Sequence, residues 1–208
     1  MNRIEALCSY IENEDKVVDV GCDQAKLGIM LAGRGINSIA SDVSVHVINR
    51  AKLTIEKLNL EDKVKLIVSD GLACVNEDVD TLVMAGMGTT TMLDILNNTD
   101  LKFKKIITIS NNHHDILRFN LNKLGYCVYE EMVINENGKY YNLIVFKEGN
   151  YDYSEKELLL GLNHKNKELY HEYLNYLLNK YEKIKLSSKD KNDNIDKYIM
   201  LIKETICM

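Results

Sequence analysis

Short apolar runs and helical stripes alternate along the first 125 residues of the chain. The apolar runs predict strands at residues 16–21, 38–42, 64–68, 81–85 and 106–109. Apolar residues at three- and four-residue spacing predict helices over residues 3–12, 25–32, 44–59, 89–97 and 115–124. Strand–helix units repeated in this way predict a parallel sheet with helices on its faces.

The alternation ends at Gly125. Two extended stretches follow, at residues 126–134 and 140–146, and the polar segment 135–138 joins them as a hairpin turn would. An antiparallel hairpin after five strand–helix units is the usual ending of the seven-stranded methyltransferase sheet. We therefore expect a Rossmann-like, seven-stranded methyltransferase sheet whose last strand is antiparallel.

The last sixty residues have a different pattern. Leu, Tyr and Lys recur at helical spacing over residues 155–186, with Gly161 as one interruption, and helix resumes at residues 196–206 after a polar connector at 187–194. We predict a small helical hairpin. The expected division is a methyltransferase domain at 1–149 and a helical, coiled-coil-like extension at 150–208.

Tyrosines recur along the longer helix of this extension, at Tyr170, Tyr173, Tyr176 and Tyr181. They fit packing between helices, and they also fit stacking on RNA bases. Both interpretations stay open at the level of sequence.

Composition narrows the class of protein. The net charge of −5 gives no overall basic field for nucleic acid, although a local basic patch remains compatible with it. The five cysteines are far apart and lack metal-ligand spacing, which indicates reduced thiols in the cytoplasm. No apolar run is long enough for a transmembrane helix, so no membrane association is expected. We also expect no metal, and the oligomeric state is open, with a monomer as one option.

Residues that could contact a ligand follow the first four predicted strands. These are Gly21 and Asp23, then Asp42, then Asp70 with Gly71, then Gly86 and Gly88. In an open parallel sheet, ligands bind where the strands end. Asp42 lies where an acid accepts hydrogen bonds from a ribose, and Asp70 lies where one accepts from an adenine amino group. A helix or turn cap is the ordinary alternative for either.

The turn after the first strand favours one cofactor. It reads GCDQA and lacks the second and third glycines of a dinucleotide fingerprint. Asp23 would repel a pyrophosphate, and Asp42 would repel a 2′-phosphate. A cofactor with a cationic sulfonium and an amino-acid end fits these carboxylates better, which indicates S-adenosyl-L-methionine.

Several motifs, in order and spacing, resemble one known family. They are DVGCDQAKLG at 19–28, SD at 41–42, SDGLA at 69–73, AGMG at 85–88, LRFNL at 117–121, GY at 125–126 and GKYYNLIV at 138–145. The chain is similar to the bacterial tRNA (adenine-N1)-methyltransferases of the TrmK family. The resemblance implies methylation of N1 of adenine 22 in tRNA with S-adenosylmethionine, on a Rossmann-like domain with a helical C-terminal extension.

The resemblance also assigns residues. The implied cofactor-binding residues are Asp19, Gly21, Cys22, Asp23, Asp42, Val43, Asp70, Gly71, Ala85, Gly86 and Met87. The implied substrate-binding residues are Gly88, Thr89, Asn111 and Arg118. Asp23 and Asn111 are the candidates for orienting the adenine or accepting a proton during catalysis, with a helix N-cap as the alternative for Asn111.

The chain departs from the family pattern in the first turn and beside the AGMG motif. The departures are Gln24, Lys26, Gly28, Thr89, Ile109 and Ser110. Two rival functions therefore remain in view: a small-molecule methyltransferase, and a non-catalytic binding protein with a methyltransferase fold. The candidate contacts to RNA phosphates are Lys102, Lys104, Lys105, Arg118, Lys123, Lys165, Lys167, Lys180, Lys183 and Lys185.

Overall fold

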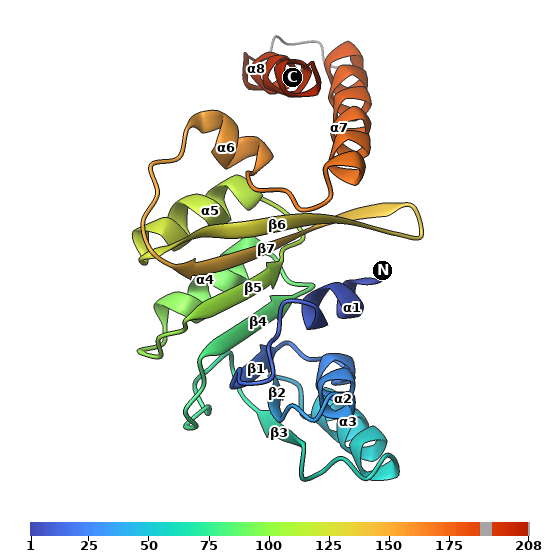
Figure 1. Cartoon of the computed structure of the whole chain (residues 1–208), viewed down its shortest axis with the longest axis vertical. Coiled ribbons are helices and arrows are strands. Elements are labelled where there is room, and N and C mark those ends of the chain that lie inside the picture. The colour runs from blue at the N-terminus through green and yellow to red at the C-terminus, as the bar shows by residue number, and fades with distance from the viewer. Residues whose placement is uncertain (188–192, 208) are drawn as a thin grey trace.

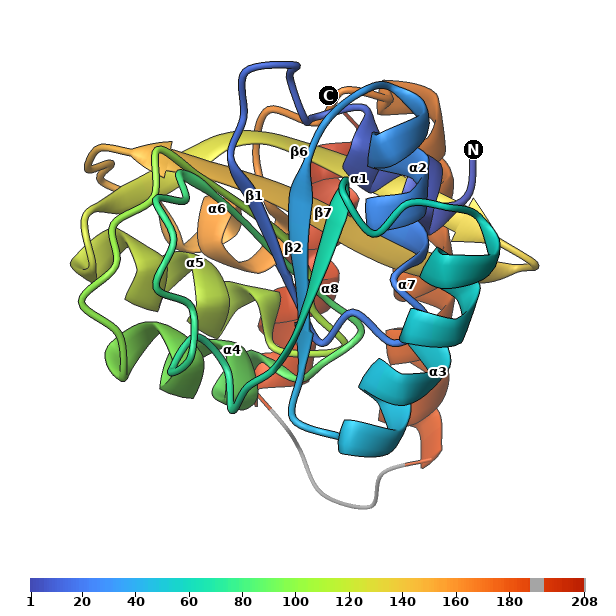
Figure 2. The ribbon, with the colours of Figure 1, turned by 90° about the horizontal axis from the view of Figure 1, so that it is seen from below.

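A single mixed sheet of seven strands forms the centre of the protein, in the order β3-β2-β1-β4-β5-β7-β6 (Figure 1). The structure is a computed structural model that describes residues 1–187 and 193–207. Helices α1, α2 and α3 lie on one face of the sheet, and α4 and α5 lie on the other (Figure 2). The three C-terminal helices lie beyond the β6 edge (Figure 1).

The strands are β1 Val17–Val20, β2 Ser38–Asp42, β3 Val64–Val68, β4 Thr81–Ala85, β5 Lys105–Ile109, β6 Tyr126–Glu136 and β7 Lys139–Glu148. The helices are α1 Arg3–Cys8, α2 Lys26–Gly33, α3 Val45–Lys57, α4 Thr89–Asn97, α5 His114–Lys123, α6 Glu155–Leu160, α7 Lys167–Ser187 and α8 Asp193–Ile206. Each predicted element over residues 1–150 is present, within a few residues of its expected ends.

The apolar run of β1 forms a central strand because all four of its residues are buried. Val18 and Val20 pack into the core that lies against α4 and α5, whereas Val17 packs into the core beneath α1 and α2. The alternation follows from the two-residue period of a strand, which points successive side chains to opposite faces. A strand buried on both faces reads as a continuous apolar run, as it does here.

Strand register brings the ends of the parallel strands to one edge. Val20 of β1 pairs with Ser41 of β2 and with Met84 of β4, and Ala85 of β4 pairs with Ile109 of β5. The turns that follow β1, β2, β4 and β5 therefore meet at the same carboxyl edge.

The predicted hairpin closes the sheet. β7 runs antiparallel between β5 and β6, and a β-bulge lies between Val128 and Glu130 of β6. This arrangement confirms the expected methyltransferase-type sheet with antiparallel final strands.

The extension differs from its prediction in one respect. The expected helix over 155–186 is two helices, because the chain turns between α6 and α7. Gly161 and Asn163 have φ angles of +83° and +53°, which a helix cannot accommodate. Most of the predicted polar connector, residues 188–192, lies outside the described residues.

The C-terminal helices share a core with the sheet. Val133 of β6 packs in one cluster with Leu160 of α6, Leu174 of α7 and Ile202 of α8. The extension is thus attached to the edge strand by apolar packing. The division into two domains at residue 149 stays a prediction.

Candidate active site

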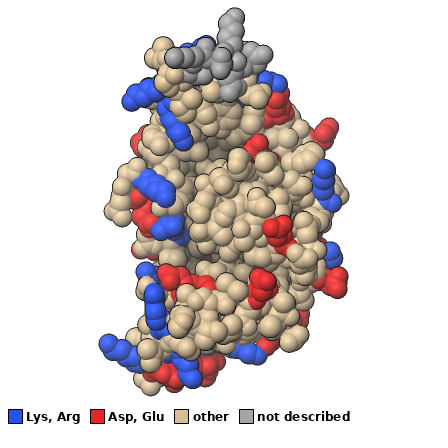
Figure 3. Space-filling model, turned by 180° about the vertical axis from the view of Figure 1, so that it is seen from behind, with Lys and Arg blue, Asp and Glu red and all other residues tan. Residues whose placement is uncertain are grey.

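A cavity of about 750 Å³ opens at the carboxyl edge of the sheet. Its lining includes six of the residues predicted to bind cofactor: Asp19, Gly21, Cys22, Asp23, Ala85 and Gly86. The face of the molecule on this side is hollowed along a mostly uncharged strip, with Lys and Arg side chains recurring along one margin (Figure 3). The ends of β1 and β4 thus form one site, as the sequence predicts.

The turn after β1 is held by β2. The backbone N–H groups of Gly21 and Cys22 both donate to the carbonyl oxygen of Ser41, at 2.9 and 3.0 Å. Gly21 has a φ of +77°, which glycine adopts at the lowest cost, and a Cβ there would lie 2.8 Å from the Met87 Cε atom. Asp23 also has a positive φ, and its side chain is exposed about 3.6 Å from the Arg50 guanidinium.

Asp19 lies buried in β1 beneath this turn, and no hydrogen bond to its carboxyl group is found among the described residues. Burial, and then the nearby charge of Asp42, raise the pKa of Asp19 to about 7. Burial also raises the pKa of the Cys22 thiol to about 12, so this thiol stays protonated near neutral pH. The floor of the cavity therefore carries a carboxyl group that a cationic ligand would ionise.

The ends of β2 and β3 lie along the same edge of the sheet, but the predicted site residues there do not line this cavity. One Asp42 oxygen, Oδ1, accepts from the Ser44 backbone N–H at 2.9 Å, which leaves Oδ2 for a ligand. Val43 beside it is 68 % exposed, an apolar side chain at a polar turn. Asp70 is exposed, and Gly71 has a φ of +55°, where a Cβ would lie 3.0 Å from the Ile95 Cγ1 atom.

The loop after β4 is braced from β5. The Asn111 side-chain Nδ2 donates to the Gly86 carbonyl oxygen at 2.8 Å, and the Asn111 backbone N–H donates to the Met87 carbonyl oxygen at 3.0 Å. Asn111 is exposed and does not cap α5, whose N-cap position is occupied by His113. Asn111 therefore positions the Gly86–Gly88 loop.

Thr89, a predicted substrate contact, lies at the start of α4. Its side chain is buried, and its hydroxyl donates to the Asn112 carbonyl oxygen at 2.6 Å and contacts the Ser110 hydroxyl at 2.8 Å. The Thr89 backbone N–H donates to the Asn112 side chain. Thr89 and Ser110, two of the departures from the family pattern, thus contact one another and join α4 to the loop after β5. Gly88 just before it is half-buried and stays a candidate.

Arg118 is also a predicted substrate contact. Its side chain is 2 % exposed, and its guanidinium binds both carboxylate oxygens of Glu131, while Nη1 donates to the Leu158 carbonyl oxygen at 2.6 Å. Arg118 thus joins α5, β6 and α6, and its contact with the substrate stays a prediction. A lone arginine in an amphipathic stretch gives no indication of such burial.

Sequence reasoning missed a second wall of the cavity. Arg3 and Glu136 line it and form an ion pair at 2.8 Å, and the Arg3 guanidinium lies 4.3 Å from the centre of the Tyr141 ring. These residues come from the leading helix and the hairpin tip, far from any strand end of the parallel sheet. No local sequence signal places them at the site, because the contact depends on the tertiary fold.

Most of the candidate RNA-binding lysines near the sheet are already paired. Lys104 pairs with Asp80, Lys105 with Asp15 and Lys165 with Glu130. Lys185 pairs with Asp196. Among the described residues, no carboxylate partner is found for Lys102, Lys123, Lys167, Lys180 and Lys183.

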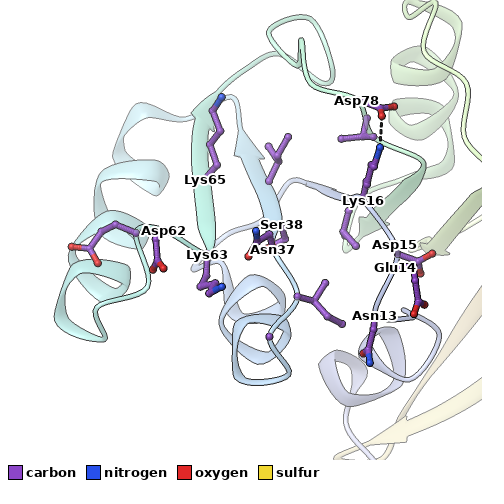
Figure 4. A pocket seen from close by; sticks show the side chains of 16 residues that line it. Asn13, Glu14, Asp15, Lys16, Asn37, Ser38, Asp62, Lys63, Lys65 and Asp78 are labelled. Carbon is purple, nitrogen blue, oxygen red and sulfur yellow. Dashed lines mark hydrogen bonds and ion pairs between the residues drawn. The ribbon is translucent and has the colours of Figure 1, made fainter.

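A second cavity lies at the opposite edge, at the amino ends of β1, β2 and β3 (Figure 4). Lys16, which is paired with Asp78, and Lys63 and Ser38 line it. None of the predicted site residues lies there, and five acids against three lysines give its lining a net negative charge. We therefore place the functional site at the carboxyl edge.

The comparison with protein families decides the class. Residues 1–144 match the family model described as a methyltransferase domain. The chain belongs to the methyltransferase domain family. The matched residues contain the whole candidate site described above.

Relatives of this chain include a tRNA (adenine(22)-N(1))-methyltransferase of Bacillus subtilis (strain 168), 28 % identical over 156 residues. That alignment covers 72 % of this chain and 66 % of the relative, so the chain spans just under two thirds of its length. The fold is similar to a crystal structure of a putative tRNA (m1A22) methyltransferase from Streptococcus pneumoniae, with a TM-score of 0.90, 26 % identity and 99 % of both chains covered. It is also similar to M. capricolum TrmK in complex with S-adenosyl-homocysteine, with a TM-score of 0.86, 27 % identity, and 100 % of this chain and 97 % of that chain covered.

Two further findings concern metal sites and membrane-spanning helices. Across residues 1–187 and 193–207, no group of three or more His, Cys, Asp or Glu side chains is placed to hold a metal ion. None of the helices in that part of the chain is long and apolar enough to cross a membrane.

Proposed function

We propose that this protein transfers a methyl group from S-adenosyl-L-methionine to N1 of adenine 22 in tRNA, in the cytoplasm. The observation that carries the proposal is the cavity at the ends of β1 and β4, lined by Asp19, Gly21 and Gly86, in a chain with methyltransferase topology. Support for the substrate comes from the relatives, whose names specify this reaction and whose structures match this chain along almost its full length.

The residues present fit the proposed cofactor. The Asp19 carboxyl group is buried without a hydrogen-bond partner among the described residues, and a ligand ammonium or sulfonium would stabilise its ionised form. The positive φ of Gly21 keeps the backbone open toward the ligand. Asp42 Oδ2 would accept from the ribose, Val43 would pack on the adenine ring, and Asp70 with Gly71 would border the adenine edge.

When bound, S-adenosylmethionine supplies a methyl group on a positively charged sulfur. The N1 lone pair of adenine forms the new N–CH₃ bond as the S–CH₃ bond breaks, so the positive charge moves from the sulfur to the adenine. Adenine N1 is already a nucleophile, and the main task of the protein is positioning. Asn111 holds the Gly86 carbonyl at the mouth of the site, and the loop from Ala85 to Gly88 leaves room for a base.

The target base must leave its stack to reach the methyl group, at a cost of a few kcal/mol. Asp23 is exposed at the rim of the cavity, where it is placed to orient the adenine edge or to receive a proton from the methylated base. We propose this role for Asp23, with Asn111 as the second orienting group.

Product analysis tests the proposal. The purified protein is incubated with S-adenosylmethionine and unmodified tRNA, and the digested nucleosides are separated by mass spectrometry. We expect 1-methyladenosine with no N6-methyladenosine. Transfer to small molecules but not to tRNA would support the small-molecule alternative, and binding of S-adenosylmethionine without transfer would support the non-catalytic one.

A further inference from the structure

A third cavity, of about 650 Å³, separates the end of β5 from the C-terminal helices. Its walls come from the loop after β5, the start of β7, and helices α7 and α8. Asn111 lines this cavity, and its side-chain amide is bonded to Gly86, which lines the cofactor cavity. The two cavities therefore lie on either side of the Asn111–Gly86 contact.

Aromatic rings dominate one wall of this cavity. The Tyr140 ring lies 5.5 Å from the Tyr173 ring and 5.1 Å from the Tyr176 ring, centre to centre. The Tyr173 hydroxyl accepts from the Asn142 side chain at 3.0 Å, which fixes the inner ring. Tyr176 remains 47 % exposed, so a large aromatic surface at the mouth of the cavity is in contact with solvent.

Two cations stand beside these rings. Lys139 and Lys180 line the same cavity, and among the described residues neither has a carboxylate partner. One acid, Asp115, also lines it, so the lining charge is positive by one. Aromatic faces next to unpaired lysines form the combination that binds single-stranded nucleic acid, because bases stack on the rings and phosphates pair with the ammonium groups.

Packing with the core does not account for the exposed ring of this cluster. Tyr140 and Tyr173 pack against the apolar cluster of the C-terminal helices, and Tyr181 and Tyr198, which line the same cavity, lie against each other. Tyr176 packs on Tyr140 and keeps 47 % of its surface exposed, at a cavity beside the proposed methyl-transfer site. Extruding one base costs unstacking energy, and contacts to its neighbours in the strand would offset that cost.

We infer that this cavity binds a nucleotide of the RNA substrate next to the target adenine, with the base stacked on Tyr176 and Tyr140 and the phosphate near Lys180 and Lys139. The inference rests on the proposed function and adds to it a second contact point on the RNA. The occupant is RNA because the lysines complement phosphate and the tyrosines complement a base.

The test compares tRNA binding and methylation by three variants with the wild-type protein. Tyr176→Ala removes the exposed ring, Tyr176→Phe keeps it, and Tyr129→Ala removes a tyrosine that is 53 % exposed on β6 outside the cavity. We expect Tyr176→Ala to raise the KM for tRNA about 5- to 150-fold, the range that loss of one stacked base produces. Tyr176→Phe and Tyr129→Ala should stay within about twofold of the wild type.

The Kd for S-adenosylmethionine serves as the check on folding, and it should be unchanged in all three variants. A second pair, Lys180→Ala against Lys57→Ala on α3, tests the phosphate contact: only the first should reduce the salt dependence of tRNA binding, by a slope of about one. Lys57 lies outside the cavity.

The outcomes are distinguishable. If the wild-type protein methylates tRNA and Tyr176→Ala does so with an unchanged KM, the nucleotide site is wrong while the proposed function stands. An equal loss in Tyr129→Ala would also overturn the site. If the wild-type protein does not act on tRNA at all, the proposed function fails first and this inference falls with it.

Discussion

The Arg118 guanidinium and the Glu131 carboxylate form a two-point ion pair inside the protein. Arg118 Nε lies 2.8 Å from Glu131 Oε1, and Nη2 lies 2.7 Å from Oε2, with the two side chains only 2 % and 1 % exposed. The pair joins helix α5 to strand β6, and the Leu162 backbone N–H also donates to Glu131. The pair thus adds a buried polar contact to the apolar packing that attaches the C-terminal helices to the sheet.

Glu131→Gln should destabilise the protein strongly. The amide keeps the shape of the side chain but leaves the Arg118 charge buried and unpaired, which costs about 3–5 kcal/mol. Chemical denaturation measures the free energy of unfolding. The control is Glu182→Gln, which removes the exposed partner of Lys203 and should cost less than about 1 kcal/mol. Equal effects of the two substitutions would show that the buried pair does not anchor the fold.

Gly161→Ala should destabilise the protein by more than its backbone angle alone explains. A Cβ at Gly161 would lie 2.6 Å from Glu131 Oε2 and 2.8 Å from Arg118 Nη2, so the ion pair would have to shift. Gly138 has a similar φ, +78° against +83°, with nothing within 4 Å of a Cβ. Gly138→Ala should therefore cost about 1 kcal/mol from strain alone, and Gly161→Ala clearly more. Matching melting temperatures for the two variants would contradict this.

Asp19 should make stability and cofactor binding depend on pH. Its folded-state pKa of about 7 is raised by burial and then by Asp42, so the native protein holds a proton that the unfolded chain releases above its ordinary pKa of about 4. Its contribution to stability is therefore full below about pH 4 and is lost as the pH rises to about 7. The loss should reach about 4 kcal/mol, an order-of-magnitude figure.

The measurement is the free energy of unfolding of wild type and Asp19→Asn at pH 5 and pH 8. The wild type should lose stability relative to the variant between these values. Because a cationic ligand favours the ionised carboxylate, the affinity of the wild type for S-adenosylmethionine should rise over the same interval, and that of the variant should not. Parallel pH profiles for the two proteins would exclude Asp19 from both effects.

Asp42→Ala should weaken S-adenosylmethionine binding by about 1–3 kcal/mol, the value of one or two hydrogen bonds to a charged group. Asp42 also accepts from the Ser44 backbone N–H, so the start of α3 loses a contact. Ser44→Ala removes the side-chain cap of α3 and leaves Asp42 in place, which makes it the matched control. Calorimetric titration gives both affinities, and an unchanged Kd in Asp42→Ala would remove this residue from the site.

Local sequence patterns predicted the sheet well because strand bounds and helix caps depend mainly on neighbouring residues. β2, β3 and β4 have the expected bounds, and Ser44 caps α3 as its position before the helix indicates. The glycine turn at Gly21 and the acids at Asp19 and Asp23 come together because register places the strand ends at one edge.

The features that the sequence did not predict share a physical cause, which is contact between distant segments. Thr89 and Arg118 are ordinary polar residues in sequence, and partners 13 to 40 positions away bury them. Arg3 and Glu136 lie 133 positions apart and form one wall of the cavity. The sequence indicated an interruption at Gly161, but it could not indicate that Gly161 packs against the ion pair of Arg118 and Glu131.

The position of methylation tests the central claim most directly. Unmodified tRNA is treated with the protein and S-adenosylmethionine, and reverse transcription is used to locate 1-methyladenine as a stop, beside a tRNA in which adenine 22 is replaced by guanine. The account predicts one new stop at position 22 that disappears in the substituted tRNA. A stop at another adenine, or no stop with a protein that binds S-adenosylmethionine, would contradict it.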